Sequence, residues 1–406
     1  MTNTAAPTLM EHSSWELFRV MSAGICSLVL TVGLARFAYT PMLPIMAKQA
    51  SLSLLAGGWL AAIHYAGYMA GALIASSIGD LNKKFVLYRA GLVLGVLSTA
   101  AMGLTTDVKV WAVLRFISGL AGTAGMLLAS GLILNWLIRN GKRAQLGLHF
   151  TGLGLGIALS GLVVATSSRA FTWDYQWVIL GAIGLLLFVP AWLWLPRPAP
   201  IQQHASAPSA APVAPSSRWM VLSILSYFCA GFGFAIGATF IVAILEKLPM
   251  FTGNGGWVWV GVGLTAVPST FLWDRAAKAM GSVHALIVAY ALHAVCIAIP
   301  VLSDAPSLNL VSALLFGGTF AGIVSLTLAI VGRHFPANPA KAMARMTLSY
   351  GVAQIGAPAM AGYIAKATGN YHDALIVTIF LLGAGLVLLR LLAREEAKVQ
   401  TASQAS

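Results

Sequence analysis

Two arginines lie deep within long apolar stretches of the sequence, where a charged side chain is unfavourable unless it has a binding partner. Arg36 follows about 15 residues after the stretch that begins at Met21, and Arg115 follows about seven after Val108. At a rise of about 1.5 Å per residue, these positions are roughly 22 Å and 10 Å along their helices. No Asp or Glu occupies the middle of any apolar stretch. The two guanidinium groups therefore present fork-shaped donors that need an anion or carbonyl oxygens.

Histidines supply the other candidate chemistry, because an imidazole can carry a proton near neutral pH without a buried carboxylate. His64 lies midway along the apolar stretch Leu54–Ile78 and shares a helix face with Tyr68. His149 lies about one turn inside the stretch that begins at Gln145. For both histidines, proton transfer and an ordinary hydrogen-bonded packing role stay open, and we favour packing.

The composition requires a bilayer around the elements that position these residues. The chain has 406 residues, of which 59% are hydrophobic and 9% charged, and its mean hydropathy is +0.85. Such a chain cannot hide its apolar side chains inside one water-soluble core. The net charge of +13 has a simpler cause in basic membrane loops than in nucleic-acid binding. The three cysteines all lie in apolar segments and indicate neither a disulfide framework nor a metal site.

Apolar runs between loop signals predict twelve membrane-spanning helices, and hence an all-α membrane protein. The first six spans are Met21–Met46, Leu54–Ile78, Phe85–Leu104, Val108–Ile138, Gln145–Ser167 and Tyr175–Leu195. The other six are Trp219–Leu245, Asn254–Ala276, Val283–Leu302, Leu308–Val331, Met343–Lys366 and Asp373–Leu392.

A charge inside such a helix is costly, at least about 2.5–3.5 kcal/mol at its centre, so both arginines should face the interior of the helix bundle. For Arg36, contact with a substrate and bonding to helix carbonyls both stay open, and we favour the substrate. For Arg115 we favour the carbonyls.

The distribution of basic residues predicts the orientation. Of the 24 lysines and arginines, 17 fall on the side of the two termini and five on the other, while Arg36 and Arg115 lie within spans. The positive-inside rule then places both termini in the cytoplasm. The polar first twenty residues lack the pattern of a signal peptide.

The chain divides into two halves that resemble each other. Residues 1–20 form a cytoplasmic segment, 21–195 and 219–392 two six-helix halves, 196–218 a cytoplasmic linker rich in proline, and 393–406 a cytoplasmic tail. IGD ending at Asp80 corresponds to LWD ending at Asp274, and GTAG at 122–125 to GTFAG at 318–322. Internal repeats are typical of transporters, with a substrate site where the repeats meet. Chance similarity between glycine-rich helices is the alternative.

This organisation resembles the major facilitator superfamily over the whole chain. The loop SSIGDLNKKF is similar to the family's loop motif, of which Asp80 and Lys84 match, while Asp274 and Arg275 remain of it in the second half. Arg115 in WAVLRFISG matches the family's arginine of the fourth span. The fifth span lacks the proline of the antiporter motif, which disfavours export by exchange. The strings GLARFAYTPMLP, GLHFTGLGLGIALSG and FGGTFAGI narrow the resemblance to the bacterial YbfB/YjiJ-like branch.

The resemblance implies a secondary carrier of the bacterial inner membrane that moves a small solute by alternating access. It also implies that Asp80, Lys84, Asp274 and Arg275 clamp helix ends. Arg36 precedes Pro44 by eight residues, as the substrate-binding arginine precedes a proline in organic-phosphate antiporters, and the family counterpart of Arg115 often bonds first-span backbone. The expected substrate is an organic anion, with or without a coupled proton. The candidate substrate-binding residues are Arg36, Tyr39, His64, Tyr68, Arg115, Thr239, Thr319, Tyr350 and Gln354.

The sequence lacks the motifs that are typical of other classes of protein. The sequence has no zincin HExxH, no GxSxG motif and no Walker A loop. We therefore expect neither an enzyme nor a cofactor or metal, and a monomer that binds lipid and a small molecule but no nucleic acid. An exporter of drug-like or amphipathic compounds and a non-transporting membrane sensor stay open as alternatives.

Overall fold

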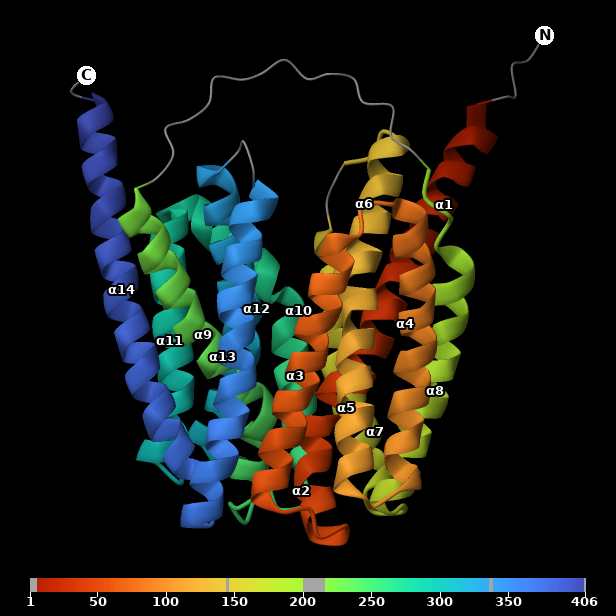
Figure 1. Ribbon diagram of the computed structural model, residues 1–406, viewed down its shortest axis with the longest axis vertical. Coiled ribbons are helices and arrows are strands. Elements are labelled where there is room, and N and C mark those ends of the chain that lie inside the picture. The colour runs from red at the N-terminus through yellow and green to blue at the C-terminus, as the bar shows by residue number, and fades with distance from the viewer. Residues whose placement is uncertain (1–5, 144–145, 200–215, 336–338, 405–406) are drawn as a thin grey trace.

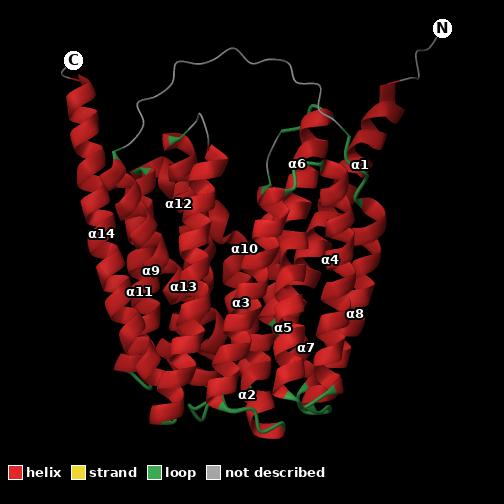
Figure 2. Cartoon of the chain, in the orientation of Figure 1, coloured by secondary structure: helices red, strands yellow, loops and turns green. Residues whose placement is uncertain are grey.

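The structure, a computed structural model, describes residues 6–143, 146–199, 216–335 and 339–404. These residues form helices and short connections, with no strand among them (Figure 2). The first half comprises α1 (Ala6–Leu28), η1 (Val29–Phe37), α2 (Tyr39–Gln49), α3 (Leu54–Ser77), α4 (Leu81–Ala101), η2 (Met102–Leu104), α5 (Val108–Thr123), η3 (Ala124–Leu128), α6 (Ala129–Arg139), α7 (Gly147–Ser167) and α8 (Trp173–Trp194). The second half comprises α9 (Ser217–Leu245), α10 (Gly255–Met280), α11 (Ser282–Leu302), α12 (Pro306–His334), α13 (Pro339–Thr368) and α14 (His372–Gln404).

These elements make the twelve predicted spans, because several labels belong to one continuous helix. A π-helical segment, η1, joins α1 to α2 in the first span, and a shorter one, η3, joins α5 to α6 in the fourth. Length and composition alone mark ten helices as able to cross a membrane. The other two spans are α3 and α13, whose polar and small residues dilute their hydropathy. Both spans pack against the other half of the molecule, so their surfaces need less apolar area.

Side-chain caps fix where several spans begin. Ser53 accepts the N–H of Ala56 at 3.2 Å at the start of α3, and Asp107 accepts the N–H of Lys109 at 2.7 Å at the start of α5. Each cap satisfies a backbone donor that the first helical turn leaves unpaired. Gly281, with φ +85°, makes the sharp turn between α10 and α11 that a side chain would strain.

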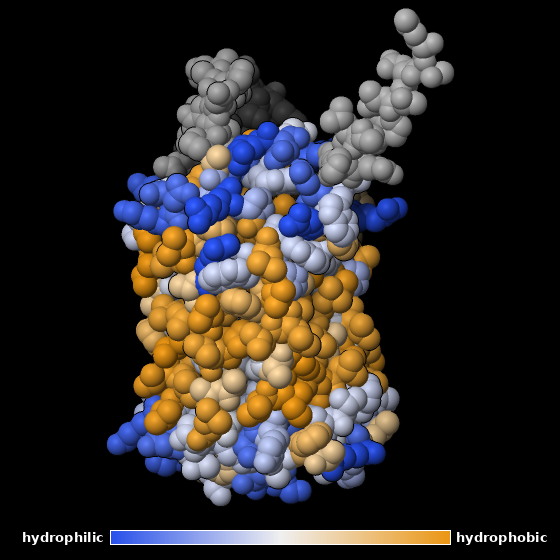
Figure 3. Space-filling model, turned by 90° about the vertical axis from the view of Figure 1, so that its right-hand side faces the viewer, coloured by the Kyte–Doolittle hydropathy of each residue, from blue (hydrophilic) through white to orange (hydrophobic). Residues whose placement is uncertain are grey.

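The helices form two groups that meet along a central interface (Figure 1). The start of α1 and the end of α14 lie on one side of the molecule, which we call the terminal side, at the top of Figure 1. On the face shown in Figure 3, a band of hydrophobic side chains covers the middle of the molecule between two hydrophilic ends. Large apolar residues are exposed in the spans, such as Phe380 and Leu186, which are 75% and 73% exposed. This surface fits a lipid bilayer, and the chain is a multi-pass membrane protein.

Glycines let helices of the two halves touch closely. A Cβ atom at Gly58 of α3 would lie 2.4 Å from the Pro358 carbonyl oxygen and 2.8 Å from the Gly362 Cα of α13. A Cβ atom at Gly154 of α7 would lie 2.5 Å from the backbone nitrogen of Val267 in α10. Small residues at such crossings bring backbones together where lipid provides no hydrophobic drive for helix association.

Candidate substrate-binding site

The first span places Arg36 at the interface between the halves. Arg36 lies in the last turn of η1, where the Ala38 N–H bonds to the Gly33 carbonyl with π-helical spacing at 3.0 Å. The same turn packs tightly on α7, because a Cβ atom at Gly33 would lie 2.4 Å from the Gly156 Cα. π-helical segments are rare in proteins and are frequently found at functional sites.

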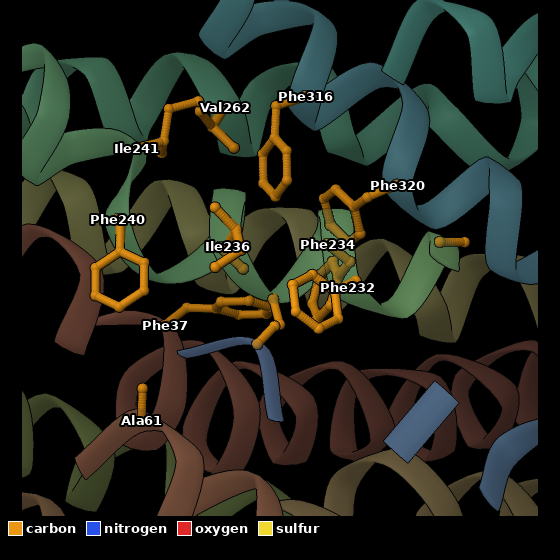
Figure 4. Packing of buried hydrophobic residues seen from close by; sticks show 14 of the residues in the cluster. Phe37, Ala61, Phe232, Phe234, Ile236, Phe240, Ile241, Val262, Phe316 and Phe320 are labelled. Carbon is orange, nitrogen blue, oxygen red and sulfur yellow. The ribbon is translucent and has the colours of Figure 1, made fainter. Parts of the chain in front are cut away.

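Three aromatic rings surround the Arg36 guanidinium. Its Cζ atom lies 4.7 Å from the ring centre of Phe37, 4.8 Å from that of Tyr65 and 5.1 Å from that of Phe234. Figure 4 shows Phe37 of η1 reaching across toward Phe234 of α9. Ring faces attract a cation, but they provide no hydrogen-bond acceptor in the guanidinium plane.

One edge of the Arg36 guanidinium is enclosed and has no partner. The Nε and Nη2 atoms are both buried and make no hydrogen bond within the described part of the chain. These two donors form the side of the fork that binds a carboxylate through two parallel bonds. A buried donor left unpaired costs about 1–3 kcal/mol, and more when it is charged. The edge therefore lacks the acceptor that it needs.

Arg115 is held differently. Its Nη1 donates to the Ala35 carbonyl at 3.0 Å, and its Cζ lies 4.3 Å from the ring centre of Tyr39. The side chain is 3% exposed, and its Nε has no partner among the described residues. Bonding to the first-span backbone agrees with the packing role that we favoured from the sequence.

His64 is the third ionisable side chain near Arg36 and Arg115. Its Nδ1 lies 2.9 Å from the Ser118 hydroxyl on α5, while its Nε2 is buried with no partner in the described ranges. The imidazole therefore has one ring nitrogen fixed and one available to a ligand or a proton.

A very small cavity of about 10 Å³, close to the space that one water molecule needs, lies between these groups. Its lining consists of Arg36, Phe37, Tyr39, Thr40, Ala61, His64, Tyr65, Arg115, Ala238 and Thr239. The volume is below the roughly 300–1,000 Å³ of pockets for drug-sized ligands. Two cations share this space without an acid in its lining, so an anion bound there would relieve their repulsion.

The cavity is closed on the side opposite the termini. The Thr40 hydroxyl donates to the Ala238 carbonyl, and the Tyr371 hydroxyl donates to the Leu54 carbonyl at 2.8 Å, so both bonds join the halves. Beyond them, Glu246 ends α9 and accepts the Gly255 N–H at 3.0 Å. Burial raises the pKa of this carboxyl, whereas that hydrogen bond and the charge of Lys48 lower it by smaller amounts. The acid thus serves the end of the span and does not line the cavity.

Five of the nine predicted binding residues line this cavity: Arg36, Tyr39, His64, Arg115 and Thr239. Tyr350 packs on Phe234, with ring centres 5.8 Å apart, so it continues the site beyond the cavity. Gln354 is one turn further along α13, and Tyr68 is one turn from His64 on α3. The structure places Thr319 apart from the cavity lining, because its hydroxyl bonds to the Leu315 carbonyl at 2.8 Å and pairs with His293 at 2.9 Å.

The loop-motif residues act locally. Asp80 caps α4 by accepting the Asn82 N–H at 2.7 Å, and Lys84 continues that first turn. Asp274 pairs with Lys278 at 2.7 Å on the surface of α10, next to the exposed Arg275. A clamp between helices by these residues stays a prediction.

The sequence did not single out the aromatic residues around Arg36. Phe37 and Tyr65 adjoin two residues that it did select, Arg36 and His64. This adjacency in the sequence could have identified Phe37 and Tyr65. Phe234 belongs to the other half, and no sequence signal linked it to Arg36. Among the described residues, no group of three or more His, Cys, Asp or Glu could hold a metal ion.

Residues 28–393 match the family described as "Uncharacterised MFS-type transporter YbfB". The chain belongs to this family. Curated relatives share shorter segments with it. It is 35% identical over 134 residues to the 4-hydroxybenzoate transporter PcaK of Pseudomonas putida, which covers 33% of this chain and 30% of PcaK. It is 27% identical over 169 residues to the uncharacterised MFS-type transporter YceJ of Bacillus subtilis, which covers 40% of this chain and 42% of YceJ. The matches thus span less than half of these two relatives.

Solved transporters share the fold of this YbfB-like chain. The nucleoside transporter NupG has a TM-score of 0.72 at 14% identity, with 94% of this chain and 98% of NupG covered. A bacterial homologue of the human lysosomal transporter Spinster, in an inward-facing and unoccupied conformation, has a TM-score of 0.64 at 16% identity, covering 95% and 98%. These likenesses establish the fold, and the predicted twelve-helix arrangement of two halves is confirmed.

Proposed function

We propose that this YbfB-like protein is a secondary carrier of small organic anions, and that the free edge of Arg36 binds the anionic group. The single observation that carries the proposal is the enclosed and unpartnered Nε–Nη2 edge at the interface of the two halves. A carboxylate would satisfy both donors at once. A cation in the same place would meet two guanidinium groups at low dielectric.

Alternating access accounts for the location of the edge. The helix groups diverge toward the terminal side in Figure 1, whereas the Tyr371–Leu54 and Thr40–Ala238 bonds join them on the other side. This supports a carrier that is closed on the side opposite the termini, and we propose an inward-facing state, which is the state of the Spinster homologue. The terminal side is then the cytoplasmic face of a bacterial inner membrane. Reporter fusions at Ala210 and Ser406 that gave periplasmic signals would contradict this orientation.

A coupled proton would use His64. It is the titratable side chain of the cavity whose free ring nitrogen faces the same space as the arginines. The name of PcaK supports a carboxylate substrate, because 4-hydroxybenzoate carries one.

Ligand binding to the purified protein tests the proposal. Thermal-shift measurements against small carboxylates, inorganic phosphate, a neutral sugar and a cationic drug should show stabilisation by carboxylates, since a ligand stabilises the state that it binds. Arg36→Lys keeps the charge but loses the fork, so it should weaken binding, and Arg36→Gln should weaken it further.

Arg89→Gln is a matched control. Arg89 also lies between aromatic rings, with its Cζ 4.7 Å from the Phe85 ring centre and 4.3 Å from that of Trp192, but it is away from the cavity lining. The control variant should bind carboxylates like the wild type. Stabilisation by the cationic drug alone would contradict the proposal.

A further inference from the structure

The buried tyrosines of this protein fall into two groups that differ in what their hydroxyls do. Four of them donate to backbone carbonyls: Tyr39 to Gly57, Tyr88 to Ala191, Tyr290 to Ser226 and Tyr371 to Leu54, at 2.7–3.1 Å. This is the usual state, because a buried tyrosine hydroxyl normally finds a hydrogen-bond partner.

The second group, which we call the open tyrosines, comprises Tyr65, Tyr227 and Tyr350. Their side chains are only 5%, 4% and 8% exposed, yet none of the three hydroxyls has a hydrogen-bond partner in the described part of the chain. The hydroxyls are also not among the fully enclosed unpartnered atoms, so each one keeps some accessible surface. Such donors are available to a ligand.

The open tyrosines continue from Arg36 as a series of ring contacts. Tyr65 and Phe234 both lie against the guanidinium, Tyr350 packs on Phe234 at 5.8 Å, and Tyr227 packs on Tyr350 at 4.5 Å between ring centres. Tyr227 precedes Phe234 by two helical turns on α9, a helix that starts on the terminal side. The series therefore leads from the charged edge toward the terminal side.

Further aromatic residues support this series from behind. The ring centre of Phe316 in α12 lies 6.3 Å from that of Phe234, and the ring centre of Phe320 lies 5.4 Å from that of Phe316. Figure 4 shows both rings beside Phe234. Rings packed in this way form flat, rigid walls, and aromatic pairs add stabilisation beyond the area that they bury. A planar ring fits such a wall better than a flexible chain does.

We propose that the substrate is a hydroxylated aromatic carboxylate. This rests on the proposed function, because the carboxylate occupies the Nε–Nη2 edge of Arg36. The ring of the substrate lies against Phe234 and Tyr350, and its hydroxyl bonds to Tyr227 and Tyr350, the two open tyrosines on the far side of Phe234 from Arg36. The cavity beside Arg36 is too small for this ring in the present conformation, so the substrate enters as the two halves rock apart.

Isothermal titration of the full-length protein with three acids tests the proposal. The acids are 4-hydroxybenzoate, benzoate, which lacks the hydroxyl, and cyclohexanecarboxylate, which lacks the aromatic ring. We expect 4-hydroxybenzoate to bind about tenfold more tightly than cyclohexanecarboxylate, with benzoate between them. Tyr227→Phe together with Tyr350→Phe keeps both rings, so it should remove the advantage of 4-hydroxybenzoate over benzoate while benzoate binding persists.

Tyr175→Phe is the control, since Tyr175 is 59% exposed at the start of α8, and it should bind all three acids like the wild type. Equal, Arg36-dependent binding of the three acids would overturn the aromatic substrate and leave the organic-anion carrier standing. An advantage of 4-hydroxybenzoate that survives the double substitution would overturn the assignment to Tyr227 and Tyr350. Absence of any Arg36-dependent binding would overturn the carrier proposal itself.

Discussion

At the residue scale, the two membrane arginines differ in what holds them. Arg115 bonds to the Ala35 carbonyl, so part of its donor capacity belongs to the first span. Arg36 has ring faces around it and no acceptor in the described structure. The same residue type thus bonds to the backbone of the bundle in one case and, in our proposal, binds the ligand in the other.

Arg115→Gln should therefore mainly weaken the fold. It removes a charge-assisted hydrogen bond of about 1.5–3 kcal/mol from a buried site. We expect the melting temperature to fall, and carboxylate affinity to fall less than in Arg36→Gln. Arg139→Gln, at the exposed end of α6, should change neither quantity. An Arg115→Gln protein with wild-type stability and no ligand binding would assign Arg115 to the substrate instead.

The sequence could locate both arginines but not their surroundings. A charge inside an apolar stretch can be recognised from the sequence alone, and so can its distance from the end of the helix. The rings of Phe37, Tyr65 and Phe234 come from three helices in two halves, and only the tertiary packing brings them to Arg36. Thr319 was predicted as a binding residue, but the structure pairs it with His293 of a neighbouring helix. The sequence alone does not identify that neighbour.

At the element scale, the spans follow from the length of apolar runs, whereas the π-helical turns do not. Hydropathy predicts that the first span continues from Met21 to Met46, and it does, but the π-helical segment η1 lies within it, where Gly33 packs closely on Gly156. Such a turn depends on the helix that packs against it, so apolar patterning cannot reveal it.

The crossing of α3 and α13 should control access from the side opposite the termini. Gly58→Ala places a methyl group where the Pro358 carbonyl and Gly362 now lie, at a cost of about 1–3 kcal/mol for the closed contact. The closed population should fall roughly 5- to 150-fold relative to the open one. Uptake into proteoliposomes should decrease, with the melting temperature showing that the protein is folded.

Gly356→Ala is the matched control on α13, because a Cβ atom there meets nothing within 4 Å. It should transport like the wild type. A folded Gly58→Ala protein with unchanged uptake would show that this crossing does not limit the cycle.

At the scale of the whole molecule, the two halves should rock about the Arg36 site. Trp59 of α3 and Tyr363 of α13 pack edge to face across the interface at 6.0 Å, and both are partly exposed to a reagent. A bifunctional thiol reagent that bridges Trp59→Cys and Tyr363→Cys should lock the halves and stop transport. The background protein should carry alanine at the native Cys26, Cys229 and Cys296.

The control for this bridge lies within one half. Phe171 and Tyr175 are 6.4 Å apart and exposed, so the pair Phe171→Cys and Tyr175→Cys can be bridged without joining the halves. Transport should continue after that reaction. Full activity in the protein bridged between α3 and α13 would contradict alternating access.

The central claim is that the free edge of Arg36 binds an organic anion during transport. Its most direct test is uptake, by proteoliposomes, of the labelled carboxylate that stabilises the wild-type protein most. Uptake should fall in Arg36→Lys and fall further in Arg36→Gln, while Arg89→Gln transports normally. A folded Arg36→Gln protein with undiminished uptake, or a transported substrate that proves to be a cation, would contradict the account.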